Sequence, residues 1–282
     1  MYFEDIWQQT DLQGAMFPDG GLTALYGRLG EQPFAAHWSS VFNASSPYRL
    51  FGNNSLSENN DTMVPLNAAV WDNIFTSDKR WGLDTIKVDH LFEAFIGDPA
   101  SSSNSTIVGG KGSNRVHLSL LTSAFDAETF LLSMAEAAER HGTSVMWCMS
   151  FPNVLMSSVM NAAMTHGRSS SDSHPNSRNF ETFAGSSTFS WAVGLWPFKD
   201  TFYTNTSSKM DPTGSNIPLN GVDAKGREDE PWAHLLVAAL SGGGVAPGDV
   251  VGGSDAALIR MSCRADGSLL KPSNPATYVG KH

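Results

Sequence analysis

The clearest pattern along the chain is a helical one, over residues 127–142. Apolar side chains recur there three or four positions apart, and Gly142 follows them as a residue suited to the end of a helix. The recurring side chains are those of Phe130, Leu131, Met134, Ala138 and His141. We predict a helix over this stretch, with this face turned toward a core.

Short apolar runs alternate with helix-like stretches along the rest of the chain. In residues 66–82, Ala69, Ile74 and Phe75 indicate one apolar face. The predicted helices cover residues 21–30, 66–82, 127–142, 153–164 and 230–243, and the predicted strands cover residues 33–39, 84–92, 143–150, 187–196 and 242–252. The polar stretches, which we expect to be surface loops, are residues 53–61, 97–114 and 205–230.

Strands that alternate with helices form a parallel sheet, either open and doubly wound or closed as a (β/α)8 barrel. A doubly wound fold needs a glycine-rich turn after an early strand, but the glycines of residues 108–112 follow no predicted strand and match neither phosphate-binding motif. A barrel carries its chemistry at the carboxyl ends of its strands. Polar residues collect at those predicted ends: His37, Asp89, Ser150, Asp172, Asp200 and Asp249. We therefore predict an α/β fold of the (β/α)8 barrel type, with residues 1–282 as a single domain.

Composition and charge narrow the classes of partner. The chain has 282 residues, of which 41% are hydrophobic and 16% are charged, and its formal net charge is −10. Nucleic acid and anionic membrane surfaces attract basic proteins, so we expect neither as a partner. Neutral and cationic small ligands fit this charge, and the oligomeric state stays open.

Cysteines and targeting signals bear on metal binding and on the compartment. The two cysteines, Cys148 and Cys263, cannot form a zinc site by themselves, and no stretch approaches the roughly 20 apolar residues of a membrane span. The N-terminal residues lack the basic and then apolar order of a signal peptide, which slightly favours the cytoplasm. Glycosylation triplets leave secretion open, and they begin at Asn43, Asn53, Asn60, Asn104 and Asn205.

Asp89 is an acid in an otherwise apolar predicted strand, where an ionised carboxylate is costly unless it is paired or used. Asp172 lies at another predicted strand end. Two carboxylates on neighbouring strand ends suit glycosidic cleavage, with one as nucleophile and the other as acid and base. The two groups lie about 5–5.5 Å apart in retaining enzymes and about 6.5–9.5 Å apart in inverting ones. Lys87 and Arg168 would help to hold Asp89 ionised.

Each of these residues also has a plain structural interpretation. Asp89 and Asp172 would then cap turns or pair with basic side chains, and Asp200 and Asp249 would be ordinary loop residues. Three tryptophans in or beside strand ends would either stack on sugar faces or fill the core: Trp147, Trp191 and Trp196.

The spacing of the histidines and serines supports neither a metal site nor a serine nucleophile. His37, His90 and His174 form neither an HxH nor an HExxH pattern, and the chain contains no GxSxG motif. We expect no metal and no other cofactor.

Taken in order, several segments resemble the α-galactosidase clan of glycoside hydrolases, most closely the raffinose synthase-like branch of glycoside hydrolase family 36. Residues 87–91, KVDHL, are similar to that branch's K-V-D motif at the fourth barrel strand, and residues 168–172, RSSSD, match the clan's R-x-x-x-D at the sixth. The other similar segments are residues 146–158, 196–202 and 240–272, which correspond to strands five, seven and eight. The best-matched part of the chain is residues 80–282.

This resemblance implies a retaining, two-aspartate mechanism on α-galactosides that needs no cofactor. Asp89 is expected as the nucleophile and Asp172 as the acid/base. Water as the second acceptor would give an α-galactosidase, and a sugar would give a raffinose synthase-like galactosyltransferase. The positions expected to bind the sugar are Lys87, Cys148, Arg168, Trp196, Asp200 and Asp249.

The chain also departs from the family. The first barrel strand and the accessory β domains have no counterpart, and a segment near the N-terminus looks like a reduced second strand that keeps Glu4, Asp5 and Trp7. Phe151 stands where the family has the histidine of C-M-S-H, and Ser171 replaces one acid of R-A-S-D-D. The alternative interpretation is a catalytically inactive sugar-binding or structural fragment of a barrel, and a third is a barrel enzyme acting on another α-linked glycan.

Overall fold

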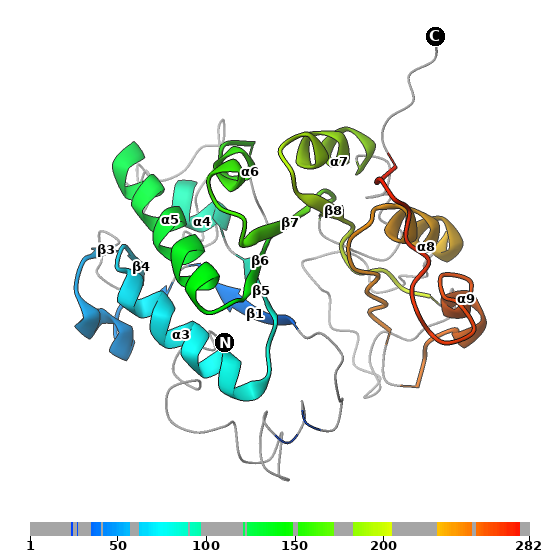
Figure 1. Cartoon of the computed structure of the whole chain (residues 1–282), viewed down its shortest axis with the longest axis horizontal. Coiled ribbons are helices and arrows are strands. Elements are labelled where there is room, and N and C mark those ends of the chain that lie inside the picture. Colours follow the sequence, from blue (N-terminus) through cyan, green and yellow to red (C-terminus); the bar gives the residue numbers. More distant parts are fainter. Residues whose placement is uncertain are drawn as a thin grey trace, which may run out of the picture. The chain divides into compact units, whose positions relative to one another are not determined.

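A computed structural model of the chain describes most of the predicted elements (Figure 1). The described residues are 24, 27, 35–40, 42–56, 62–89, 91–96, 121, 123–148, 152–171, 183–204, 230–249 and 252–276. The chain divides into two compact units, Met1–Thr165 and His166–His282. The predicted helix over residues 21–30 and the predicted loops over residues 97–114 and 205–229 lie essentially outside the described residues.

Three parallel strands form the sheet of the first unit. β5 (Thr85–Asp89) lies between β1 (Ala35–Ser39) and β6 (Ser144–Trp147) and pairs with both in parallel. The strands predicted over residues 33–39, 84–92 and 143–150 are therefore confirmed, and so is their parallel arrangement.

Two long helices, α3 (Ala68–Trp81) and α5 (Ala124–Arg140), accompany these strands and lie side by side in Figure 1. In α5 the predicted face is confirmed, because Phe130, Leu131, Met134 and Ala138 are buried. Ser123 begins this helix by accepting a hydrogen bond from the backbone N–H of Asp126, and Gly142 follows its end with φ of 59°.

The apolar face of α3 differs from the prediction at one position. Val70, Trp71, Ile74 and Phe75 are fully buried, whereas Ala69 is exposed. The buried residues repeat at i, i+1, i+4 and i+5, which is the spacing of a single helical stripe, and Ala69 falls at its edge. Trp71 contacts Phe130 of α5 with ring centroids 5.9 Å apart.

A small antiparallel sheet follows β1 along the chain. β4 (Thr62–Pro65) pairs with β2 (Phe42–Asn43) and with β3 (Asn54–Leu56), and the short 3-10 helix η1 (Pro47–Phe51) connects β2 to β3. The loop predicted over residues 53–61 is thus wrong for residues 54–56. Their turn-forming composition is overridden by β4, which supplies hydrogen-bond partners from outside the segment.

The helix predicted over residues 153–164 is shorter than expected. It consists of α6 (Pro152–Ser157) and one 3-10 turn, η2 (Ser158–Met160), and β7 (Met164–Arg168) begins where the prediction had it end. Asn161 stops the helix, because its side chain accepts a hydrogen bond from the Ala163 backbone at 2.7 Å. Ala163 then accepts from the Val145 backbone of β6 at 2.7 Å, which starts the next strand.

In the second unit, the end of β7 pairs in parallel with β8 (Trp196–Phe198). The strand predicted over residues 187–196 is wrong for most of its length, because α7 (Phe183–Ala192) occupies residues 183–192. A short apolar run does not distinguish a strand from a buried helix segment. Gly194, with φ of 89°, ends the helix and turns the chain into β8.

The predicted helix over residues 230–243 is confirmed as α8 (Pro231–Leu240). The next segment runs parallel to β8 and its extension, since Gly243 donates to Pro197 O and Gly248 donates to Phe202 O. Glycine is required at position 243, where a Cβ would lie 2.4 Å from Phe198 Cβ. A short helix, α9 (Ala256–Arg260), completes the described elements.

The described strands give a partial parallel sheet with helices between its strands, and a complete eight-stranded barrel stays a prediction. None of the described helices is both long enough and apolar enough to cross a membrane.

Candidate active site at the strand ends

Lys87 and Asp89 project from the same face of β5. Burial alternates along this strand: Ile86 and Val88 are fully buried, whereas Thr85, Lys87 and Asp89 are half-buried. Side chains two residues apart on a strand share a face, so the ammonium and the carboxylate lie on one side and the packed residues on the other.

The face that carries Lys87 and Asp89 continues onto β6. Lys87 lies in register with Met146, which is also half-buried. Thr85 and Ser144 are bridged across the two strands by a hydrogen bond of 2.7 Å between their hydroxyl groups. This half-buried face is the surface of the first unit on which a polar ligand could contact Asp89.

Asp89 ends β5, as the sequence predicted. It lies in register with Ser39, and its carbonyl oxygen accepts a hydrogen bond of 2.8 Å from the Ser40 backbone. Both neighbouring strands end at the same level, because the Cys148 N–H donates to Val88 O at 2.9 Å. The strand ends are therefore held together by backbone bonds, which fixes the Cα of Asp89 at the carboxyl edge.

Cys148 and Trp147 are buried rather than open to solvent. Both side chains have no exposed surface, and the indole N–H of Trp147 donates to the Ser158 hydroxyl at 3.0 Å. For Trp147 the structure supports the core interpretation over the sugar-stacking one. Cys148 lies directly behind the end of β6 and forms no disulfide.

Arg168 and Asp200 are brought together at the strand ends of the second unit. Arg168 ends β7, Asp200 follows β8, and their side chains form an ion pair with 3.5 Å between Nη1 and Oδ2. The two side chains are only 9% and 13% exposed, so water screens the pair weakly.

Asp200 is further held through its main chain. Its N–H donates to the buried Ser170 hydroxyl at 2.9 Å, and its carbonyl accepts from the buried Lys199 ammonium at 3.1 Å. The same ammonium donates to Thr201 O at 3.3 Å and lies 5.5 Å from the centroid of the Phe202 ring. These contacts fix the carboxylate of Asp200 beside Arg168.

Trp196 packs against Trp191, and Asp249 accepts hydrogen bonds from Thr204. Trp196 begins β8, so it lies at the amino end of the strand, and its ring centroid is 4.8 Å from that of Trp191. Asp249 accepts from the Thr204 backbone at 2.9 Å and from the Thr204 hydroxyl at 2.6 Å. Thr204 in turn accepts from the Asp255 backbone, so Asp249 ties two loops together.

Two titratable side chains of the second unit, His166 and Lys271, were not singled out by the sequence analysis. His166 lies two residues before Arg168 on β7, and Lys271 donates a hydrogen bond to the carbonyl oxygen of Gly243. Burial, reinforced by the positive charge of Lys271, lowers the pKa of His166 below its usual value, and burial also lowers the pKa of Lys271. The period of two along β7 could have indicated His166, whereas Lys271 is far away in the sequence.

Several predicted site positions lie outside the described residues: Asp172, Ser150, His90, His174 and Phe151. The separation of the Asp89 and Asp172 carboxyl groups therefore stays a prediction. Among the side chains that the structure does describe, no group of three or more His, Cys, Asp or Glu is arranged to hold a metal ion.

The structure is similar to two crystal structures of a glycoside hydrolase family 27 β-L-arabinopyranosidase from Geobacillus stearothermophilus. The wild-type enzyme is 14% identical in sequence, and a variant crystallised in complex with arabinose is 13% identical. Each match has a TM-score of 0.54 and covers 86% of this chain and 55% of the neighbour. No protein-family model and no curated protein matches the chain.

This likeness concerns the fold. The chain spans about half the length of the enzymes it matches, which are (β/α)8 barrels, and it shares with them a mixed α/β architecture with a partial parallel sheet. The barrel-type fold predicted from the alternation of strands and helices is thereby confirmed in part, and family 27 belongs to the same clan as the α-galactosidases of family 36.

Proposed function

We propose that this chain is a retaining glycosidase of the α-galactosidase clan, with Asp89 as its nucleophile and Asp172 as its acid/base. The observation that carries the proposal is the position of Asp89 and Lys87 on one half-buried face at the carboxyl edge of β5, in a fold similar to that of a glycosidase. Chemistry in barrels of this type occurs at that edge.

The reaction would proceed in two displacements. In the first, a carboxylate oxygen of Asp89 attacks the anomeric carbon, and the bond to the leaving oxygen breaks as Asp172 gives that oxygen its proton. In the second, Asp172 takes a proton from an acceptor hydroxyl, whose oxygen attacks the anomeric carbon and releases Asp89. Lys87 would favour the ionised state of Asp89 by its charge and would bind sugar hydroxyls.

We propose α-D-galactosides and β-L-arabinopyranosides as the substrate class. The two sugars share their ring stereochemistry and differ only by the hydroxymethyl group on C5, and the structural neighbour is a β-L-arabinopyranosidase that was crystallised with arabinose. Arg168, held beside Asp200, would bind sugar hydroxyls. A sugar hydroxyl in place of water would make the reaction a raffinose synthase-like transfer.

The test is hydrolysis of aryl α-D-galactoside and aryl β-L-arabinopyranoside by the full chain and by two matched variants. Asp89→Asn should lower kcat/KM by at least about a thousandfold, as expected for a lost nucleophile. Asp84→Asn, which removes an exposed carboxylate just before the same strand, should leave it unchanged. Azide should rescue Asp89→Gly by replacing the missing nucleophile.

Two results would contradict the proposal. If a folded wild-type chain, checked by circular dichroism, turned over neither glycoside, the inactive-fragment interpretation would replace it. If Asp89→Asn and Asp84→Asn had the same activity, Asp89 would not be the nucleophile. Incubation with raffinose and galactinol, followed by product separation, distinguishes hydrolysis from transfer.

A further inference from the structure

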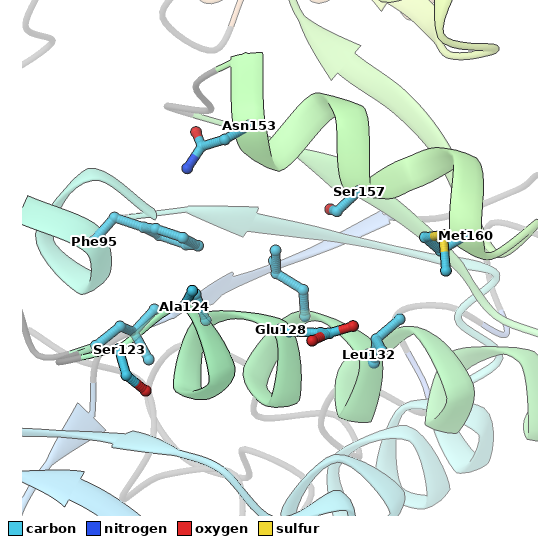
Figure 2. A pocket seen from close by; sticks show the side chains of 11 residues that line it. Phe95, Ser123, Ala124, Glu128, Leu132, Asn153, Ser157 and Met160 are labelled. Carbon is cyan, nitrogen blue, oxygen red and sulfur yellow. The ribbon is translucent and has the colours of Figure 1, made fainter.

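A cavity of about 570 Å³ opens between helices of the first unit, as Figure 2 shows. It is bordered by α4 (Leu91–Ile96), α5 and α6, and none of the residues proposed for catalysis lines it. Its lining is largely apolar and includes Phe95, Leu131 and Met160. The volume is within the range of roughly 300–1,000 Å³ that small-molecule sites occupy.

A few polar groups from two helices stand around this apolar surface. Glu128 comes from α5, and Asn153 and Ser157 come from α6 (Figure 2). The Ser157 hydroxyl already donates to Val154 O at 2.6 Å, so it can only accept a further hydrogen bond. Apolar walls with a small number of polar groups from different elements are typical of ligand sites.

The charged group that lines the cavity is negative. Glu128 is its ionisable lining residue, and no Lys, Arg or His is found among the lining residues that the structure describes. Its carboxylate accepts hydrogen bonds and cannot donate them, and the chain as a whole carries a net charge of −10. A ligand that complements this site brings a positive charge with N–H donors.

The apolar lining of the cavity is partly exposed. Met160, which lines the cavity, is 67% exposed, so part of the apolar lining is open to solvent. We propose that the cavity binds small amines that carry an apolar body. The hydrocarbon body lies against Phe95, Leu131 and Met160, and the protonated nitrogen donates to Glu128. This proposal is independent of the glycosidase proposal.

The test uses two probes with the same aromatic body and opposite charge, 2-naphthylmethylamine and 2-naphthoate, titrated into the full chain by calorimetry at neutral pH. The amine should bind saturably at one site, and naphthoate should bind at least about fivefold more weakly, because it loses an exposed ion pair worth up to about fivefold and is also repelled by the Glu128 carboxylate. Equal affinities, or no saturable binding of the amine at millimolar concentration, would overturn the proposal.

Three variants locate the site. Ala127→Phe places a ring in the cavity and should abolish amine binding. Glu128→Gln should weaken it about two- to fivefold, whereas Glu136→Gln, an exposed acid elsewhere on α5, should leave it unchanged. If Ala127→Phe does not fold, the comparison of the two glutamate variants decides whether the amine binds in this cavity. Equal losses of amine affinity in Glu128→Gln and Glu136→Gln would refute the assignment. So would a dimer on gel filtration that covers this face and prevents the amine from binding.

Discussion

The Arg168–Asp200 ion pair is expected to stabilise the second unit more than a surface ion pair does. Asp200→Asn removes one charge with almost no change in volume, and Arg168→Met removes the other while keeping an apolar stem. Both side chains are nearly buried, at 9% and 13% exposure. Each single substitution removes one charge of the pair while the other charge stays desolvated.

The magnitude follows from the burial and the geometry. Removing one member of a buried pair costs about 3–5 kcal/mol, whereas exposed pairs contribute about 0.2–1 kcal/mol. The Nη1–Oδ2 distance between Arg168 and Asp200 is 3.5 Å, longer than the best charge-assisted bonds of about 2.7–2.9 Å. We therefore expect each single substitution to lower the free energy of unfolding by about 2 kcal/mol, with a coupling energy of about 1–2 kcal/mol in the double-mutant cycle.

The assay is urea unfolding followed by circular dichroism, with equal m-values required in all four proteins. A second cycle on Arg140 and Asp72 is the control, because that pair has a shorter contact of 2.9 Å but side chains 48% and 38% exposed. Its coupling should stay below about 1 kcal/mol. The reasoning is refuted if the Arg168–Asp200 coupling is no larger than that of the exposed pair, since burial would then not decide its strength.

Two further predictions concern the same unit. Because the pKa of His166 is lowered on folding, the unfolded chain binds a proton there at higher pH, so stability should fall as the pH drops through the usual value of 6.5. His166→Asn should flatten this dependence in unfolding curves measured at about pH 5.5 and about pH 7.5, and an unchanged slope would contradict it. Gly243→Ala should lower the free energy of unfolding by about 1–3 kcal/mol, because the new Cβ overlaps Phe198. Gly244→Ala meets no atom within 4 Å and should change stability by less than about 0.5 kcal/mol, so equal effects would refute the overlap.

The sequence was sufficient to predict an element where one segment contained both a clear hydrophobic period and the residues that end the element. The helix of residues 124–140, its buried face and the glycine after it follow from spacing and capping within that stretch. The strand with Lys87 and Asp89 is a similar case, because a period of two places both side chains on one face whatever the partners of the strand are.

Elements that depend on distant partners could not be predicted. Residues 54–56 form a strand because β4 lies beside them, and the apolar residues 187–192 form a helix although they were interpreted as a strand. The hydrogen-bond partners of Trp147 and Asp249 were also decided this way, since Ser158 and Thr204 are distant in sequence.

The sequence by itself determined the parallel strands and the long helix of the first unit, and it determined that Asp89 ends β5. Only the tertiary structure decided which polar residues meet, pairing Arg168 with Asp200 and placing His166 near Lys271. The physical reason is range. Hydrophobic periodicity and helix ends act over a few neighbouring residues, whereas ion pairs, burial and strand pairing depend on groups that come together only when the chain folds.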